Sequence, residues 1–391
     1  MPINCGAIVA MIAVIGGGIC GLGIGWRLVQ AGQEVTIFER GLAGKEATWA
    51  AAGMLAPQVE VEHGEEVLLP LALESRAMWK NFASELFDAT AIDVDYREEG
   101  TIVLGLNRDD IEHLENRMTF IEKLGLDVNW LSGHEIRKKQ PHLGRSIAGG
   151  IYSALDHQVD NRRAAIALKK AFLGAGGILK ENIEVLGVMT AAGRVSGLEL
   201  VDDEVRVDTV VVAAGAWSRN IMGLPEISRP PVRPLKGQMV AVQMDPQLPL
   251  IDNVIWGPGN GVVPSIYLAP KTDGRLLIGA TVEEMGFDKN LTAGGLMELL
   301  RLAWEILPGI YDLPIVESWA GLRPASRDDA PILGPTPTTG IVLATGHHRN
   351  GVLLAPITAR VIADYLVNGT VDKIIKPFSI NRFLKTNNVN V

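Results

Sequence analysis

The sequence predicts a fold that combines α/β and α+β architecture, in which a parallel-sheet domain is interwoven with an antiparallel-sheet domain. Two segments predict the parallel sheet. Val14–Arg40, "VIGGGICGLGIGWRLVQAGQEVTIFER", has the pattern of strand, glycine turn, helix and strand, and Thr209–Ala213 is typical of a buried strand. Antiparallel strands are predicted between Arg229 and Trp319, where segments such as "VRPLKGQMVAVQM" alternate between two faces.

The composition is that of a globular protein, with 391 residues of which 47% are hydrophobic and 21% are charged. A net charge of −9 disfavours a nucleic-acid partner, because phosphates require clustered lysine and arginine. The only two cysteines, Cys5 and Cys20, exclude a disulfide framework and fit the reducing cytoplasm, where we expect the protein. The seven histidines show no metal-ligand spacing, so no metal is expected.

The first strand lies in a stretch without charged residues, Cys5–Trp26, that is long enough to cross a bilayer. We interpret it as a strand–turn–helix unit instead, because its strongly apolar part, Ala7–Ile15, has strand length and six glycines follow. A signal peptide is disfavoured because no lysine or arginine precedes the apolar run. Met11 is an alternative start of the chain, since "MIAVIGGG" begins there.

The glycines of the turn have the spacing G-x-G-x-x-G, which is typical of a dinucleotide site. Gly16 permits the tight turn, Gly18 lets the backbone approach a pyrophosphate, and Gly21 lets helix and strand pack closely. The start of the helix adds partial positive charge. Glu39, at the end of the second strand, is expected to accept hydrogen bonds from the adenosine ribose. This unit alone does not distinguish FAD from NAD.

The next segment, Gly41–Pro57 or "GLAGKEATWAAAGMLAP", favours FAD. An NAD enzyme would normally continue with a strand and a helix, whereas this segment is a loop of small residues. Such residues can hold the backbone against phosphate and flavin with little bulk; they are Thr48, Ala51, Ala52 and Gly53. A flexible start of a helix is the alternative interpretation.

Five segments occur in an order that resembles a known family: "VIGGGICGLGIGWRL", "EATWAAAGMLAP", "VVVAAGAWS", "GLRPASRDDAPILGP" and "GHHRNGVLLAP". Over nearly the whole chain they resemble the D-amino-acid oxidase superfamily of flavoproteins, and within it the glycine oxidase family of the thiamine pathway. The resemblance implies a Rossmann-like FAD-binding domain of residues 1–89, 150–219 and 320–391. Residues 90–149 and 220–319 would form the substrate-binding domain, and the active site would lie between the two.

The resemblance also implies roles for individual residues. Arg323 would bind the substrate carboxylate, since a guanidinium can donate two parallel hydrogen bonds to it, and Tyr267 would assist. Arg349 would lie over the flavin and the substrate entrance, and Met54 would line the pocket beside the flavin ring. From the residues alone, Arg323 could instead form a salt bridge with Asp328 or Asp329. Arg349 could be a surface arginine, and Tyr267 a core tyrosine.

The glycine loop 346–353 is expected to precede a last helix, Val352–Tyr365, which Gly351 would open. The resemblance implies that the positive end of that helix faces the flavin pyrimidine carbonyls, where it would stabilise the reduced anionic flavin. The full set of residues expected to bind FAD is Gly16, Gly18, Ile19, Cys20, Gly21, Glu39, Arg40, Thr48, Ala51, Ala52, Gly53, Met54, Val185, Ala214, Gly215, Trp217, Arg323, His348, Arg349, Asn350, Gly351, Val352 and Leu353. Binding is expected to be noncovalent, because relatives with covalent flavin use a cysteine near the C-terminal motifs and this chain has none after Cys20.

The implied activity is oxidative deamination of glycine or a related small amine or amino acid, such as sarcosine or a D-amino acid. Hydride would pass from Cα to flavin N5, and the products would be an imine or 2-oxo acid, ammonia and, with O₂, H₂O₂. In the thiamine pathway, glycine imine would serve thiazole synthesis. No residue is identified as a general base, and His347 and His348 are interpreted as structural. A homo-oligomer, either a tetramer or a dimer, is expected.

Three alternatives remain open at this point. One is a D-amino-acid or sarcosine dehydrogenase that passes electrons to a quinone. Another is an oxidase of primary amines, because Ser265 stands two residues before Tyr267, where the family has a histidine. The third is a scaffold that is stabilised by FAD and has no catalytic activity.

Overall fold

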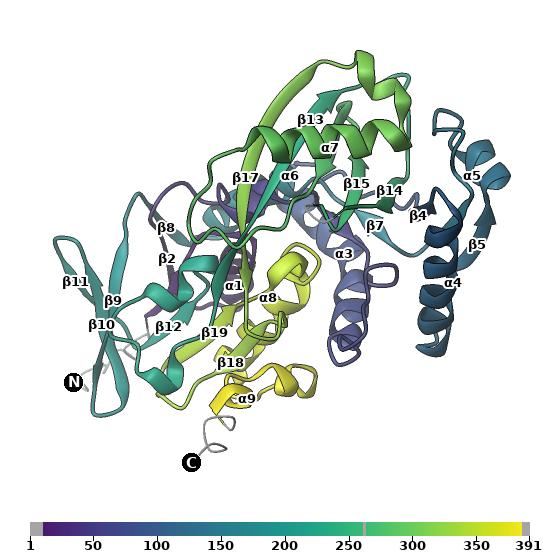
Figure 1. Cartoon of the computed structure of the whole chain (residues 1–391). Coiled ribbons are helices and arrows are strands. Elements are labelled where there is room, and N and C mark those ends of the chain that lie inside the picture. Colours follow the sequence, from purple (N-terminus) through teal and green to yellow (C-terminus); the bar gives the residue numbers. More distant parts are fainter. Residues whose placement is uncertain (1–10, 261–262, 385–391) are drawn as a thin grey trace, which may run out of the picture.

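The structure is a computed structural model, described for residues 11–260 and 263–384. One of its two large sheets has six strands (Figure 1). The strand order is β18-β19-β12-β1-β2-β8. Neighbouring strands are parallel except for β18, which is antiparallel to β19. The strands are β1 (Ile12–Ile15), β2 (Val35–Glu39), β8 (Ile178–Glu181), β12 (Thr209–Val212), β18 (Ile332–Pro335) and β19 (Ile341–Thr345).

The central strand β1 is buried on both faces, which explains its uninterrupted apolar sequence. Ile12 and Val14 belong to a core shared with the helices, whereas Ala13 and Ile15 belong to a core on the opposite face. That opposite face is covered by a three-stranded antiparallel sheet of β9 (Val185–Ala191), β10 (Arg194–Leu200) and β11 (Glu204–Arg206). The helices are α1 (Ile19–Gln30), α3 (Leu69–Thr90), α6 (Asn161–Gly174) and α8 (Ala355–Asn368).

Glycines on α1 allow this helix to lie close to its neighbours. A Cβ at Gly25 would lie 2.8 Å from Ile37 of β2, and a Cβ at Gly23 would lie 3.2 Å from Ala359 of α8. The sequence pattern predicted α1 to within one residue. The last helix begins at Ala355 rather than at Val352, so Gly351 does not open it, and this expectation was wrong. A short 3₁₀ turn (η4, His348–Asn350) comes first, and Leu354 N then donates to Asn350 O.

A second sheet has eight strands in the order β17-β13-β16-β15-β14-β4-β6-β5. Its pairs are antiparallel apart from β4 and β14. The strands are β4 (Thr101–Gly105), β5 (Asn129–Ser132), β6 (Gly149–Ser153), β13 (Arg233–Gln243), β14 (Val254–Pro258), β15 (Ser265–Pro270), β16 (Arg275–Gly279) and β17 (Ile315–Ala325). Two of them, β6 and β17, run across the expected domain boundaries at 149/150 and 319/320.

The two faces of this second sheet have different neighbours (Figure 1). On β15, Ile266 and Leu268 share a core with α7 (Ala293–Ile306), whereas Tyr267 and Ala269 belong to the core of the other face. This follows from the two-residue period of a strand. The remaining elements are the helices α2 (Ala47–Ala50), α4 (Arg108–Lys123), α5 (Gly133–Lys139) and α9 (Asn381–Leu384), the paired strands β3 (Met54–Leu55) and β7 (His157–Gln158), and the 3₁₀ helices η1 (Gly215–Asn220), η2 (Glu226–Ser228), η3 (Pro308–Asp312) and η5 (Lys373–Phe378).

The question of a membrane anchor concerned Cys5–Trp26. Its first part, including Cys5, lies outside the described residues, and so do residues 7–10 of the apolar run Ala7–Ile15. Across residues 11–260 and 263–384, no helix combines the length and the apolar character that crossing a membrane would require.

Candidate functional site

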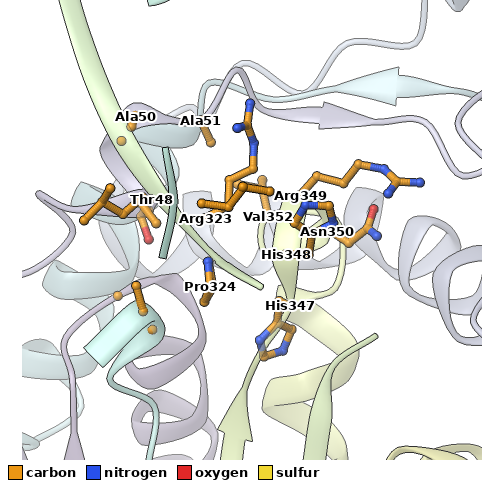
Figure 2. A pocket seen from close by; sticks show the side chains of 18 of the residues that line it. Thr48, Ala50, Ala51, Arg323, Pro324, His347, His348, Arg349, Asn350 and Val352 are labelled. Carbon is orange, nitrogen blue, oxygen red and sulfur yellow. The ribbon is translucent and has the colours of Figure 1, made fainter. Parts of the chain in front are cut away.

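A cavity of about 1080 Å³ lies where the six-stranded and eight-stranded sheets meet. Every residue that the sequence assigned to substrate or cofactor lines this cavity, with the exception of Gly21. In Figure 2, Thr48 and Ala50 lie on one side, Arg349 and Asn350 on the other, with Arg323 between them. The segments involved are far apart in the sequence, and the two sheets bring them together.

The glycine turn after β1 is shaped by close backbone contacts. Gly16 has φ +107°, and a Cβ there would lie 2.5 Å from Ala213 O. A Cβ at Gly21 would lie 2.0 Å from Gly16 O, which explains why Gly21 is packed beneath the turn rather than lining the cavity. Gly18 is the N-cap of α1 and has no side chain that could cap the helix. Gly18 and the first residues of α1 line the cavity, so the start of this helix faces it. Thr48 Oγ1 accepts a hydrogen bond from Ile19 N at 3.0 Å.

The acidic residue at the end of β2 is held by the backbone. Glu39 accepts hydrogen bonds from Gly17 N at 2.8 Å and from Gly41 N at 3.0 Å. Next to it, the guanidinium of Arg40 lies 3.6 Å from the ring centroid of Trp217. An aromatic ring, a carboxylate and the start of α1 therefore share this end of the cavity; the last two are features of a dinucleotide site.

The small-residue loop is fixed to β7 and α6. Gly53 has φ +78°, and a Cβ there would lie 2.0 Å from Val159 O, so the two backbones are in direct contact. Val159 N donates to Gly53 O at 2.8 Å, and Asn161 Nδ2 donates to Thr48 O at 2.7 Å. Because the loop carries no bulky side chain at 50–53, its backbone is accessible from the cavity.

Arg323, on β17, is a buried cation whose hydrogen-bonding capacity is only partly used. Nη1 donates to Lys236 O at 3.3 Å and to Thr281 O at 3.1 Å. A Cβ at Gly237 would lie 2.6 Å from Nη1, so only glycine leaves room for the guanidinium there. Burial lowers the pKa of Arg323, but an arginine remains charged near neutral pH.

The alternative salt bridge of Arg323 is not formed. Asp328 is bonded to Arg382 at 2.7 Å, and Asp329 lies 3.8 Å from Arg233. Among residues 11–260 and 263–384, Arg323 has no carboxylate within ion-pair distance. A ligand carboxylate would therefore meet a guanidinium with Nε and Nη2 free of side-chain acceptors.

Tyr267 lies in the cavity wall near Arg323. Its hydroxyl donates to Met239 Sδ at 3.0 Å, and a Cβ at Gly279 would lie 2.4 Å from its oxygen. Burial raises the pKa of Tyr267 to about 12, although the charge of Arg323 opposes this shift. The hydroxyl is therefore protonated at neutral pH and can donate a hydrogen bond to a ligand in place of the thioether.

Arg349 is paired rather than being a surface arginine. Its Nη2 lies 2.6 Å from Glu65 Oε2, and its Nε lies 3.5 Å from Glu60 Oε2. Although burial opposes the shift, these carboxylates raise the pKa of Arg349. Burial in turn raises the pKa of Glu60 to about 7. Sequence reasoning missed Glu60, for which the only signal was the acidic run "EVEHGEE" after the small-residue loop.

The two adjacent histidines are both neutral at physiological pH. Burial lowers the pKa of His347 to about 4 and that of His348 to about 3. His347 Nε2 lies 3.1 Å from Thr358 Oγ1 and 3.7 Å from Cys20 Sγ, which fits a structural role. Burial also raises the pKa of Cys20 to about 12, so this cysteine is a thiol rather than a thiolate.

Comparison with known proteins agrees with this geometry. The family model described as FAD dependent oxidoreductase (DAO) matches residues 11–365. The chain is 36% identical to the glycine oxidase of Geobacillus kaustophilus over 376 residues, which cover 95% of this chain and 97% of that protein. It is also 36% identical to the bifunctional protein ThiO/ThiG of Trichormus variabilis, covering 96% of this chain and about half (55%) of that protein. The crystal structure of Geobacillus kaustophilus glycine oxidase superposes with a TM-score of 0.87 over 95% of this chain and 99% of that one, which confirms the predicted fold class.

Proposed function

Because this chain belongs to the family of FAD-dependent oxidoreductases, we propose that it oxidises the Cα–N bond of glycine or of a related small amino acid such as sarcosine or a D-amino acid. The relatives named glycine oxidase support this substrate class, since they match over nearly the whole chain. The observation that carries the proposal is Arg323, a buried guanidinium that lines the cavity and has no carboxylate partner within the described residues.

The chain's own residues would bind and orient the amino acid. Arg323 donates two hydrogen bonds to its carboxylate, and Tyr267 donates a third. Anchoring the carboxylate places the Cα–H bond in one orientation, which is the main contribution that such a site can make to rate. FAD held by the residues that line the cavity would supply the two-electron oxidation of the amino acid, and O₂ would reoxidise it with formation of H₂O₂.

No protein base is needed if the amine binds in its neutral form. Loss of hydride from Cα then leaves an iminium, which loses a proton to water, and hydrolysis releases the 2-oxo acid and ammonia. The low pKa values of His347 and His348 make both weak bases, in agreement with this scheme. The match to the ThiO half of ThiO/ThiG supports the further proposal that the imine serves thiazole synthesis in the thiamine pathway.

FAD would be bound noncovalently by the residues around the cavity. The cysteine expected in relatives with covalent flavin would lie near the C-terminal motifs, whereas Cys20 lies at the start of α1, where its Sγ is near His347 Nε2 and Gly351 O. We also propose that residues 1–89, 150–219 and 320–391 bind FAD, that residues 90–149 and 220–319 bind substrate, and that the enzyme is a cytoplasmic homo-oligomer.

Substrate screening in air tests the proposal. The purified protein loaded with FAD is mixed with glycine, sarcosine, D-alanine, D-proline and a simple amine, and peroxide is measured. We expect peroxide with glycine or sarcosine. Flavin reduction that gives no peroxide in air but reduces an added quinone would favour the dehydrogenase. Turnover of the simple amine alone would favour the amine oxidase that Ser265 permits.

A further inference from the structure

Lys271 is a buried lysine in the turn between β15 and β16, and it does not line the cavity. Its Nζ donates to Val159 O at 2.7 Å, to Ala52 O at 2.8 Å and to Gln158 Oε1 at 3.2 Å. All three donors of the ammonium are therefore used, and each acceptor is neutral. Lys271 as a whole residue is 3% exposed, so these bonds are sheltered from water.

The acceptors belong to the loop that faces the cavity and to the strand that supports it. Ala52 lies between Ala51 and Gly53, and Val159 directly contacts Gly53 through the backbone. Lys271 thus joins the backbone of the loop to the eight-stranded sheet, whose strand β15 also carries Tyr267. Met54 and Gln158 pair in the small sheet of β3 and β7, so the ammonium lies at the end of this ladder.

Hydrogen bonds and an ion pair from charged residues of several elements hold the turn around Lys271 in place. Thr272 N donates to Asp95 Oδ2 at 3.1 Å, and Arg275 pairs with Asp160 at the start of α6. Arg97 donates to Pro270 O at 2.9 Å. The carboxylates of Asp160 and Asp95 compensate the ammonium at longer range, whereas Arg97 and Arg275 oppose it.

We propose that Lys271 is a positioning residue that holds the Ala51–Gly53 backbone in the conformation that receives the flavin. This inference rests on the proposed assignment of that loop to the cofactor. Without the ammonium, the carbonyls of Ala52 and Val159 would lack a donor in a buried site, and the loop would relax away from β7. The residue touches neither substrate nor flavin in this account, and it acts through the loop.

Binding of FAD to the apoprotein tests the proposal without relying on catalysis. Lys271→Met keeps the length of the side chain and removes the ammonium. Lys170→Met is the matched control, because Lys170 also donates to a main-chain carbonyl, Thr90 O at 2.7 Å, but lies outside the cavity. Flavin fluorescence at pH 6.5 should show a Kd for FAD at least about tenfold higher in Lys271→Met than in wild type, with Lys170→Met unchanged.

The pH profile separates positioning from a general loss of stability. Burial lowers the pKa of Lys271 to about 8, so the ammonium loses its proton between pH 6.5 and 9.5. Although burial opposes the shift, Asp160 and Asp273 raise the pKa of Arg275, so it keeps its charge in this range. Burial also opposes the shift of Asp160, but the backbone of Arg163 together with Lys271 and Arg275 lowers its pKa, so Asp160 stays ionised. Glu60 lines the cavity and has a pKa of about 7, so it titrates in this range in both proteins. The Kd of the wild type should therefore rise severalfold more across the range than that of Lys271→Met.

The outcomes distinguish this inference from the proposed function. Equal Kd values for wild type and Lys271→Met at pH 6.5 would overturn the role of Lys271 while leaving the flavin site intact. If Lys271→Met does not fold, a wild-type Kd that is constant from pH 6.5 to 9.5 would overturn it instead. A wild-type apoprotein that fails to bind FAD at all would contradict the proposed function itself.

Discussion

Replacing Arg323 by methionine should abolish recognition of a substrate carboxylate while leaving the cavity nearly the same size. The guanidinium is buried, and its hydrogen bonds to the protein are both donated by Nη1, to Lys236 O and Thr281 O. Breaking a buried charge pair by removing one partner costs about 2–5 kcal/mol. This predicts a fall in kcat/KM for glycine of about 30- to 5000-fold.

The assay compares two kinds of substrate in the same variant. Steady-state peroxide production is measured with glycine and with an amine of similar size that lacks a carboxylate. Only glycine should lose kcat/KM by the predicted factor, because the amine never used Arg323. Arg137→Met serves as the control, since Arg137 also donates to a main-chain carbonyl, Ile147 O at 2.8 Å, and neither residue lines the cavity.

Three results would refute the reasoning about Arg323. Glycine kinetics that do not change in Arg323→Met would show that the carboxylate binds elsewhere. An equal loss for glycine and for the amine would show that the variant damages the site in general, as would loss of bound FAD in the variant's spectrum.

Three further predictions concern the turn, the acidic pair and specificity. Gly16→Ala should destabilise the apoprotein by roughly 1–3 kcal/mol, because Gly16 has a positive φ and a Cβ there would meet Ala213 O. Gly18→Ala should leave the melting temperature of the apoprotein unchanged and weaken FAD binding. Calorimetry and FAD titration that showed the reverse pattern would contradict this. Glu60 holds a proton in the folded chain up to about pH 7 that the unfolded chain releases near pH 4, so its stability contribution is full below pH 4 and is lost as the pH rises through 7. Urea unfolding at several pH values therefore tests this. Between pH 5 and 8 the free energy of unfolding should fall by up to about 3 kcal/mol more in wild type than in Glu60→Gln. An equal fall in the two proteins would contradict the raised pKa of Glu60. Ser265→His should change the ratio of kcat/KM for glycine to that for a simple amine, because Ser265 lines the cavity on the strand that carries Tyr267. An unchanged ratio would show that Ser265 does not determine substrate specificity.

Local chemistry explains which features could be predicted from the sequence. The start and end of α1 depend on the glycine turn and on apolar spacing within a few residues, so the pattern placed this helix to within one residue. Tyr267 and Arg323 were chosen by motif, and each lies in the cavity because strand alternation and the strand end place it there. The start of α8 was predicted three residues too early, because residues 347–354 form turns, closed by Asn350 N to His347 O and Leu354 N to Asn350 O, before the helix begins at Ala355.

The contacts that were missed join segments far apart in the chain. Arg349 lies 284 residues from Glu65, and Lys271 lies 219 residues from Ala52, so no local pattern indicates either contact. Burial then sets the chemistry of such groups, since it moves the pKa of Glu60 and of Lys271 toward neutrality. These properties arise only when the two sheets meet around the cavity.

Anaerobic mixing of the FAD-loaded protein with glycine tests the central claim most directly. If the cavity holds a flavin and Arg323 presents an amino acid to it, the visible absorbance of the oxidised flavin should bleach on addition of glycine or sarcosine and return when air is admitted. A flavin spectrum that stays unchanged with every small amino acid offered, in a protein that has bound FAD, would contradict the account.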